Sequence, residues 1–302
     1  MSKKLVTVFT PTYNRAHTLV RTYESLCKQT CDDFEWLIID DGSTDNTEEV
    51  VKGWLQEKKI PLRYIKKENG GLLSGYNKAM EYIDSELNVC VDSDDFMPSN
   101  AISIIKKEWD KLKDKNLAGI IGLDYQITGE VVGGVFPITG RFYYWEKLYK
   151  LKHSCDSKIV CRTDLMKKIA PLPTFGEKDF NPIWYYFFIG EKYKFHLINK
   201  CLCVVDYQPD GMSYGIYKQY RQSPKSNMET RRILMSSKFV PQKEKMKAAL
   251  HYISSSIFSK NKNFIKESPQ KLLTLLAIPP GLLLHCFILY KLYKQRKIHF
   301  QI

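Results

Sequence analysis

The chain has 302 residues, of which 44% are hydrophobic and 26% are charged, so its composition is that of a folded protein and excludes an intrinsically disordered one. The length is enough for one large α/β domain, or for one domain with an extension. The formal net charge of +13 suits nucleic acid, anionic lipid or phosphorylated substrates, and charge alone does not choose among these partners.

The first hundred residues alternate between strand-like and helix-like segments. Short apolar runs predict strands at residues 5–10, 34–39, 62–65 and 87–91. Helical spacing of apolar residues predicts helices at 18–28, 45–56 and 72–83. This order, with short connections, predicts a parallel, doubly wound sheet. Such sheets bind ligands at the carboxyl ends of their strands.

Acidic clusters follow two of the predicted strands. Asp40 and Asp41 could accept hydrogen bonds from a base or a ribose, although a helix start decorated with acids is the structural alternative. Asp92, Asp94 and Asp95 repel one another unless a cation or hydrogen-bond donors neutralise them. Mg²⁺ and Mn²⁺ prefer such oxygen ligands and often bridge to a substrate diphosphate, whereas a solvated turn or a helix cap would need no metal.

Several motifs of other enzyme classes are absent from the sequence. No GxGxxG follows the first predicted strand, and the chain has no GxxxxGK[ST] and no GxSxG. Dinucleotide redox chemistry, P-loop hydrolysis and serine-hydrolase chemistry are therefore disfavoured. The remaining interpretation is a sheet that offers carboxylates and a metal to a nucleotide.

One polar motif follows each of the four predicted strands: residues 9–15 (FTPTYNR), 40–45 (DDGSTD), 68–71 (ENGG) and 92–95 (DSDD). Their order and spacing resemble the inverting family 2 glycosyltransferases. The resemblance covers residues 5–110 and continues more weakly to about residue 213. It implies the Rossmann-like GT-A fold, with a mostly parallel, doubly wound sheet, and transfer of a sugar from a nucleoside-diphosphate sugar.

The resemblance also implies roles for particular residues. Asp41 would hydrogen-bond the base, Asp92 would lie near the ribose, and Asp94 together with Asp92 would hold Mg²⁺ or Mn²⁺ on the diphosphate. The metal would neutralise the charge that develops on the leaving group. The nucleotide-sugar-binding residues would be Thr10, Pro11, Tyr13, Arg15, Asp41, Asn69, Gly70, Gly71, Asn77 and Asp92.

Inversion requires a general base near the acceptor hydroxyl. In the family this base is a carboxylate in a Glu-Asp type motif, and the candidates here are Glu177, slightly preferred, and Asp179; a surface acidic turn is the alternative. The chain departs from the family pattern at two positions. Lys178 stands where Asp is frequent, and Tyr76 stands where many relatives carry an Arg before Asn77.

We expect three parts along the chain: a nucleotide-sugar-binding half at 1–110 and an acceptor half at 111–215, which together form one GT-A domain, and a basic helical extension at 216–302. Residues 272–290 of this extension contain no charged residue. Their length nearly matches the ~20 residues of a spanning helix, but Pro279-Pro280-Gly281 disfavours one straight helix. With lysines on both flanks, 272–297 is expected to lie in or dip into an anionic membrane surface; a buried hairpin or a dimer contact is the alternative.

The eight cysteines form no CxxC pair, and the N-terminus lacks the apolar stretch of a signal peptide, so we expect reduced thiols in a cytoplasmic protein at the inner face of the cell membrane. The donor would be an NDP-sugar, with UDP favoured. The acceptor would be a saccharide, polyprenyl-linked, as in capsule, exopolysaccharide or O-antigen assembly. The alternative is a non-catalytic, membrane-bound scaffold with a degenerate transferase domain. No nucleic-acid-binding motif is present, so nucleic acid is not an expected partner.

Overall fold

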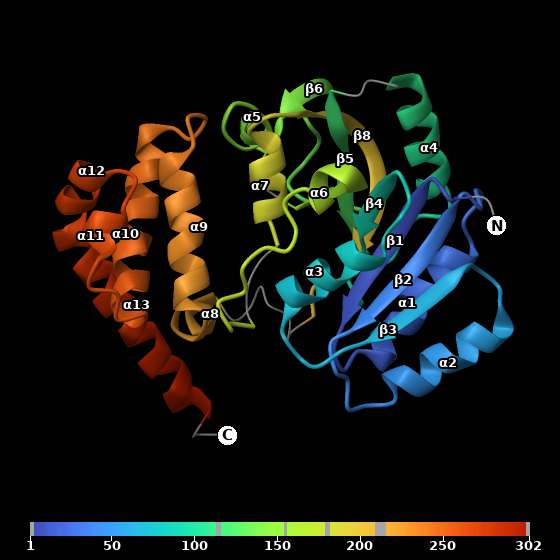
Figure 1. Ribbon diagram of the computed structural model, residues 1–302, viewed down its shortest axis with the longest axis horizontal. Helices are drawn as coiled ribbons and strands as arrows, with labels where there is room; N and C mark the ends of the chain where they lie inside the picture. The colour runs from blue at the N-terminus through green and yellow to red at the C-terminus, as the bar shows by residue number, and fades with distance from the viewer. Residues whose placement is uncertain (1–2, 113–115, 154–155, 179–181, 209–215, 300–302) are drawn as a thin grey trace. The chain divides into compact units, whose positions relative to one another are not determined.

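The computed structural model describes residues 3–112, 116–153, 156–178, 182–208 and 216–299. The chain divides into two compact units. The first unit contains residues 1–172 and 182–208, and the second contains 173–181 and 209–302. All the named strands belong to the first unit, and the helices from α8 onward belong to the second (Figure 1).

The predicted alternation of strands and helices is confirmed in the first hundred residues. β-branched and aromatic residues form the strands, and α1 buries Leu19, Tyr23 and Leu26, whose spacing places them on one helical face. The elements are β1 (Val6–Thr12), α1 (Ala16–Cys27), β2 (Phe34–Asp40), α2 (Thr47–Glu57), β3 (Leu62–Lys66), α3 (Leu72–Tyr82), β4 (Leu87–Cys90) and α4 (Ala101–Leu112).

The rest of the first unit completes an eight-stranded sheet in the order β3-β2-β1-β4-β7-β5-β8-β6. β7 pairs antiparallel with β4 and β5, β8 pairs parallel with β5, and β6 pairs antiparallel with β8. The sheet is therefore parallel in its first half and mixed in its second. The additional elements are β5 (Leu117–Gln126), β6 (Gly140–Tyr143), α5 (Tyr144–Tyr149), β7 (Ser157–Arg162), α6 (Thr163–Lys167), α7 (Trp184–Gly190) and β8 (Lys194–Val205).

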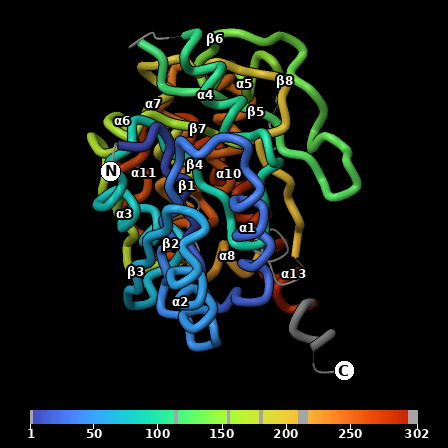
Figure 2. The backbone as a smooth tube through the Cα atoms, turned by 90° about the vertical axis from the view of Figure 1, so that its right-hand side faces the viewer, coloured from blue at the N-terminus to red at the C-terminus, as the bar shows by residue number. Residues whose placement is uncertain are grey.

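The register of the parallel half aligns the carboxyl ends of its strands. The four strands lie next to one another in the sheet, as the tube view in Figure 2 also shows. Thr12 of β1 pairs with Asp40 of β2, and Asp40 pairs with Lys66 of β3. On the other side of β1, Phe9 pairs with Cys90 of β4. The segments that follow these four strands therefore leave the sheet at one edge, as expected for a doubly wound fold.

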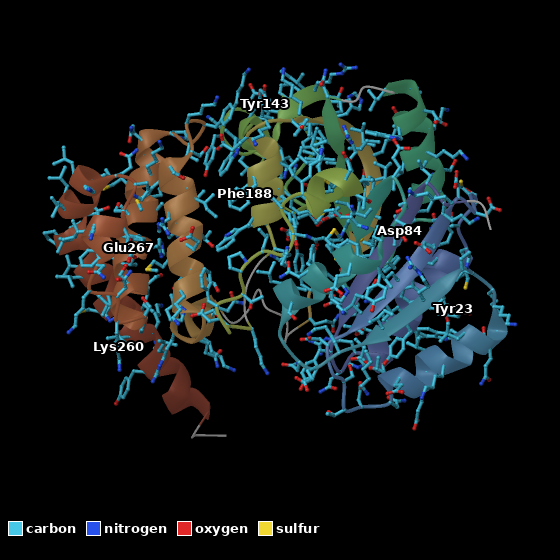
Figure 3. The ribbon with its side chains drawn as sticks, viewed as in Figure 1. Tyr23, Asp84, Tyr143, Phe188, Lys260 and Glu267 are labelled. Atoms are coloured by element: carbon cyan, nitrogen blue, oxygen red, sulfur yellow. The ribbon has the colours of Figure 1, made fainter. Side chains whose placement is uncertain are left out.

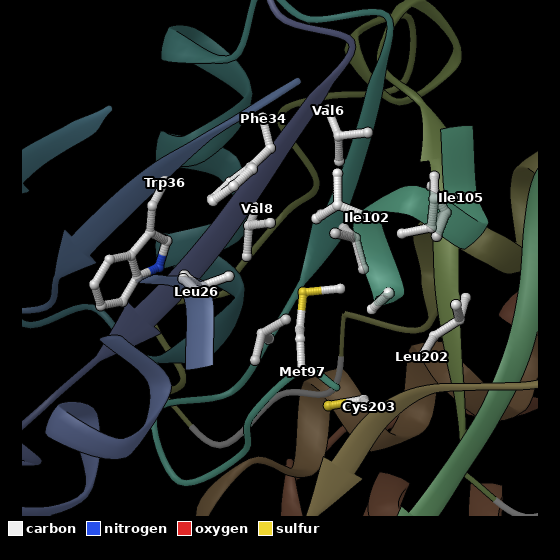
Figure 4. Packing of buried hydrophobic residues seen from close by; sticks show 14 of the residues in the cluster. Val6, Val8, Leu26, Phe34, Trp36, Met97, Ile102, Ile105, Leu202 and Cys203 are labelled. Carbon is white, nitrogen blue, oxygen red and sulfur yellow. The ribbon is translucent and has the colours of Figure 1, made fainter. Parts of the chain in front are cut away.

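Helices cover both faces of this sheet. On one face, α1, α2 and α4 bury apolar side chains against β1, β2 and β4, including Val8, Trp36 and Ile102 (Figure 4). Within this layer, Tyr23 of α1, labelled in Figure 3, stacks on Trp54 of α2 with 4.3 Å between ring centroids. The apolar area that this layer removes from water is the main force that holds the helices on the sheet.

On the opposite face, α3 packs on β1. Tyr76 meets the ring of Phe9 edge-on at 4.9 Å, and a Cβ added at Gly75 would come within 3.1 Å of Pro11. A larger residue at position 75 would therefore require Pro11 or the helix to shift slightly. Tyr76, at the position where the resemblance led us to expect an arginine, is thus a core residue that is 6% exposed.

The second unit is helical, as predicted for the C-terminal extension. Its core contains Met235, Tyr252, Ile253 and Ala277. Its helices are α8 (Ile216–Gln222), α9 (Pro224–Ser236), α10 (Gln242–Phe258), α11 (Phe264–Glu267), α12 (Lys271–Leu276) and α13 (Ile278–His299).

The apolar segment 272–290 is divided between α12 and α13, which confirms that it is not one straight helix. Pro279 and Pro280 lie in the first turn of α13, where a missing N–H removes no intrahelical hydrogen bond. Among the residues that the structure describes, no helix has both the length and the apolar character needed to cross a bilayer.

Candidate functional site

Asp41, directly after β2, organises the glycine motif that follows β3. Its Oδ1 accepts hydrogen bonds from Lys67 Nζ at 2.5 Å and from the Gly70 N–H at 2.9 Å, and its Oδ2 accepts from the Gly71 N–H at 2.7 Å. Asn69 donates its amide N–H to the Asp41 carbonyl oxygen at 2.9 Å. A carboxylate offers about four acceptor positions, so Oδ2 keeps one that these hydrogen bonds do not use, on a side chain that is 7% exposed.

The two glycines of this motif are favoured for different reasons, a backbone conformation at Gly71 and a side-chain contact at Gly70. Gly71 has a φ of +85°, a conformation that side chains with a Cβ disfavour. A Cβ at Gly70 would lie 2.5 Å from Ser74 Oγ. A larger residue would therefore strain the backbone at position 71 and force Ser74 to move at position 70.

The loop after β1 joins the same edge through Asn14. The Asn14 N–H donates to Ser43 Oγ at 2.9 Å, and Asn14 Oδ1 accepts from the Thr44 N–H at 2.8 Å. Tyr13 beside it is 47% exposed, so its ring is accessible to a ligand. The loops after β1, β2 and β3 are thus tied together by hydrogen bonds.

The turn after β4 carries the acidic cluster. Asp92 is exposed, Asp94 is half-buried, and Asp95 is buried. Burial raises the pKa of the Asp94 carboxyl, the charge of Asp92 raises it further, and the charge of Arg15 from the loop after β1 acts in the opposite direction. This electrostatic interaction places the loops after β1 and β4 in one neighbourhood.

Asp95 closes the buried side of this acidic turn. Lys158 of β7 lies beneath it, with Nζ 3.6 Å from Asp95 Oδ2, and neither side chain is more than 10% exposed. Burial raises the pKa of Asp95, while the charge of Lys158 lowers it. The buried lysine thus offsets part of the repulsion that the acidic turn creates.

The donor set of Asp92 and Asp94 fits a hard divalent cation. Among the described residues, no group of three or more His, Cys, Asp or Glu side chains is arranged to hold a metal. Mg²⁺, however, is normally bound by one or two carboxylates together with waters and substrate phosphates rather than by a protein cage. Two adjacent carboxylates, one of them half-buried, are suited to that mode of binding.

Three predicted donor-binding residues use their side chains within the fold. Thr10 Oγ1 accepts a hydrogen bond from Trp36 Nε1 at 2.9 Å, and Pro11 packs on α3. The Asn77 side chain exchanges two hydrogen bonds with the backbone of Leu172 and accepts one from the Tyr185 hydroxyl at 2.7 Å. The predicted donor contacts of these three side chains stay predictions.

Glu177, the preferred candidate for the general base, lies in the second unit. Glu177 accepts the backbone N–H groups of Lys225 and Ser226 at 2.9 and 2.7 Å, so its carboxylate caps the N-terminus of α9. Asp179 lies outside the residues that the structure describes.

Motif reasoning missed three residues around the acidic turn. They are Lys158 of β7, Arg21 of α1 and Asp206 after β8. Arg21 and Asp206 form an ion pair in which Arg21 Nη1 lies 2.8 Å from Asp206 Oδ2. They come from segments far apart in the chain and have no characteristic spacing. Only their position beside the turn connects them with the site.

Replacement of Asp41 by Asn tests the loop anchor. Asn offers a single acceptor oxygen and no charge for Lys67, so Asp41→Asn should lower the free energy of unfolding by about 1–3 kcal/mol. It should also speed hydrogen exchange at the amides of Gly70 and Gly71. Urea denaturation and exchange monitored by mass spectrometry measure both effects. Glu48→Gln, at a carboxylate that is 34% exposed and paired with Lys52 and Lys66, is the matched control and should leave the exchange unchanged. Unchanged exchange in Asp41→Asn would show that the anchor is unimportant.

Solved structures show a similar fold. S. aureus TarS 1–349 in complex with UDP-GlcNAc has a TM-score of 0.62 at 17% identity and covers 91% of this chain and 80% of its own. Mannosyltransferase PcManGT from Pyrobaculum calidifontis, in complex with GDP-Man and Mn²⁺, has a TM-score of 0.54 at 18% identity and covers 99% of this chain and 83% of its own. The predicted GT-A fold class is confirmed.

Sequence relatives match the first unit over shorter stretches. Chondroitin synthase from Pasteurella multocida (strain Pm70) is 39% identical over 114 residues, which are 38% of this chain and 12% of that protein. Glycosyltransferase GlyG from Streptococcus pneumoniae is 30% identical over 146 residues, 48% of this chain and 47% of that protein. The chain therefore spans less than half the length of either relative. The family model described as "Glycosyl transferase family 2" matches residues 7–167, more than half of the chain, and so the chain belongs to glycosyl transferase family 2.

Proposed function

We propose that this chain is an inverting glycosyltransferase that moves a sugar from a nucleoside-diphosphate sugar to a saccharide acceptor. The observation that carries the proposal is the common edge at which the loop held by Asp41 and the turn carrying Asp92 and Asp94 leave the sheet. Asp41 offers a hydrogen-bond acceptor for the nucleotide base. Asp92 and Asp94 offer carboxylates for a cation bound to the diphosphate. Family membership supports the same reaction class.

A uridine donor suits the hydrogen-bonding state of Asp41. Two donors already bind Oδ1, whereas one donor binds Oδ2. A base N–H, such as N3–H of uracil, would use the remaining acceptor position of the carboxylate. The complex of the similarly folded TarS with UDP-GlcNAc agrees with this choice. Because PcManGT was solved with GDP-Man, a guanosine donor is the main competitor.

Asp94, with Asp92, would hold Mg²⁺ or Mn²⁺ against the diphosphate. When bound, the ion supplies positive charge that stabilises the leaving nucleoside diphosphate. The chain contributes a rigid acidic turn, because Asp95 and Lys158 fix its buried side. The exposed Tyr13 would cover the base of the donor.

Asp94→Ala tests this proposal. The variant should lose Mn²⁺-dependent binding of UDP in isothermal titration, and turnover of a UDP-sugar should fall by about a hundredfold or more, since several kcal/mol of charge stabilisation are lost. The control is Asp84→Asn, at a residue labelled in Figure 3 whose side chain is 76% exposed before the amino end of β4. Full turnover by Asp94→Ala would contradict the metal assignment. A wild-type protein that binds neither UDP nor GDP with Mn²⁺ would instead support the non-catalytic scaffold.

The general base is proposed to be Glu177 or Asp179. Both oxygens of Glu177 already accept backbone N–H groups of α9, which gives this residue a structural use and favours Asp179 as the base. Inversion requires the base to take the proton of the acceptor hydroxyl as the sugar is transferred.

Two isosteric variants separate these candidates. Asp179→Asn should lower transfer to a saccharide acceptor by about a hundredfold or more without affecting UDP binding, because general-base catalysis contributes roughly that much. Glu177→Gln should mainly lower the melting temperature, since it weakens the cap of α9. The assay compares transfer rates, UDP affinity and thermal unfolding of both proteins. A loss of transfer confined to Glu177→Gln would reverse the assignment.

The acceptor is proposed to be lipid-linked because the outer face of α13 is apolar. Leu283, Phe287 and Tyr290 recur on one side of this helix and are 73%, 46% and 58% exposed. Ile288 on the opposite side is 1% exposed, and His285 there lies 3.1 Å from the Ser254 hydroxyl. The helix thus has an inner face packed in the unit and an outer face on which Leu283 and Tyr290 are largely exposed, while Phe287 also meets the ring of Tyr217 of α8 at 6.4 Å.

Charge supports a lipid surface as the partner of this face. Lys271, Lys291 and Lys294 flank the apolar residues, and residues 271–294 contain no acidic residue. An apolar helical face bordered by lysines lies in the plane of an anionic membrane, and each lysine near that surface contributes about 1 kcal/mol. We therefore propose peripheral attachment through 272–297 at the inner face of the cell membrane.

Vesicle binding tests the attachment. The wild-type protein should co-sediment with phosphatidylglycerol vesicles, bind phosphatidylcholine vesicles weakly and dissociate at high salt. Leu283→Glu combined with Phe287→Glu should abolish this binding. Ile138→Glu, at an apolar residue of the first unit that is 59% exposed, should leave it intact. Equal binding by the double variant, or a wild-type dimer that the double variant dissolves, would contradict a lipid surface.

A further inference from the structure

The acidic turn after β4 is held between α1 and the end of β8. Thr22 of α1 donates its hydroxyl to the Asp95 carbonyl oxygen at 2.7 Å. On the other side, Phe96 and Val204 exchange two backbone hydrogen bonds of 3.0 and 2.8 Å. The turn is therefore tethered at its far end by two elements that no motif connects with it.

Arg21 joins these two elements at the turn itself. Its Nη2 donates to the carbonyl oxygen of Asp94 at 2.5 Å, and its Nη1 pairs with Asp206 Oδ2 at 2.8 Å. The guanidinium also lies 5.3 Å from the ring centre of Phe96. A planar guanidinium can hold two acceptors in a fixed geometry, which the single ammonium of a lysine cannot do.

The exposure of this pair indicates what it contributes. The side chains of Arg21 and Asp206 are 36% and 31% exposed, and ion pairs so accessible to water add little to the free energy of unfolding. The contact with Asp94, however, is made to the main chain of the residue whose carboxylate would hold the cation. Its effect should therefore fall on the position of that carboxylate more than on overall stability.

We propose that Arg21 is a positioning residue for the metal–diphosphate site, acting through the carbonyl group of Asp94 and anchored by Asp206; this inference rests on the proposed function. A cation that joins Asp92, Asp94 and a diphosphate accepts a narrow range of carboxylate positions. A turn that moves must be ordered when the ligand binds, and that ordering weakens binding. Arg21 removes this cost by ordering the turn beforehand, as outer contacts do in other metal sites.

Arg162 provides a matched control at the opposite edge of the sheet. Like Arg21, it spans a carboxylate and a main-chain carbonyl group, with Nη2 2.7 Å from Asp164 Oδ2 and Nη1 3.3 Å from the Leu117 oxygen. It lies at the end of β7 that pairs with the amino end of β4. Arg162→Ala removes an arginine with a similar pair of contacts but keeps the contact between Arg21 and Asp94. It therefore measures the effect of losing such an arginine elsewhere in the fold.

The experiment measures Mn²⁺ binding by electron paramagnetic resonance in the presence of UDP, together with thermal unfolding, for the 302-residue chain and its variants. Arg21→Ala should weaken Mn²⁺ binding by about ten- to a hundredfold, the range typical of lost outer contacts. Arg21→Lys and Asp206→Asn should fall between this variant and the wild type, with melting temperatures close to that of the wild type. Arg162→Ala should bind Mn²⁺ as the wild type does, whatever its melting temperature.

Wild-type affinity in both Arg21→Ala and Arg21→Lys would overturn the positioning role and leave the proposed function standing. If Arg21→Ala does not fold, Arg21→Lys alone decides, because it keeps the positive charge and loses the two-point contact. Equal weakening by Arg162→Ala would show a general loss of stability and would also overturn the inference. A wild-type protein that binds no Mn²⁺ with UDP overturns this inference and the metal assignment together.

Discussion

The parallel register of β1, β2, β3 and β4 is the constraint on which the candidate site depends. Because Thr12, Asp40 and Lys66 lie at the same level across three strands, the chain leaves the sheet repeatedly at one edge. Polar residues follow each of these strands. If the strands were antiparallel, these residues would lie at opposite edges of the sheet and could not form one site. The buried apolar layers on both faces maintain this register, since a slip by one residue would move each buried side chain to the opposite face and disrupt its packing against the helices there.

Several carboxylates lie at one edge of the sheet and repel one another. Two sets of contacts in the fold offset this repulsion. Asp41 is neutralised by Lys67 and by backbone N–H groups, which convert its charge into an anchor for the glycine loop. The acidic turn is compensated from below by Lys158 and from the side by Arg21. Asp92 is exposed and Asp94 is half-buried, and their residual negative charge is what would attract a divalent cation.

The second unit adds two features of a different kind. Glu177 stabilises the start of α9, so a carboxylate that looks catalytic in the sequence has a clear structural use. The outer face of α13 combines exposed apolar residues with flanking lysines, whereas its inner face is packed. The same helix thus contributes to the core of its unit and offers a surface suited to lipid.

The sequence by itself determined the order of strands and helices in the first hundred residues, the fold class and the acidic and glycine motifs, because local apolar periodicity and strand-end polarity are visible without any long-range contact. It also indicated the break within residues 272–290, since proline restricts the backbone locally. Only the tertiary structure decided that Thr10 and Asn77 use their side chains inside the fold, that Glu177 caps α9, and that β7 enters the sheet antiparallel. It alone brought Arg21, Lys158 and Asp206 to the acidic turn, because a contact between residues more than 50 positions apart depends on the packing of whole elements and leaves no periodic trace in the chain.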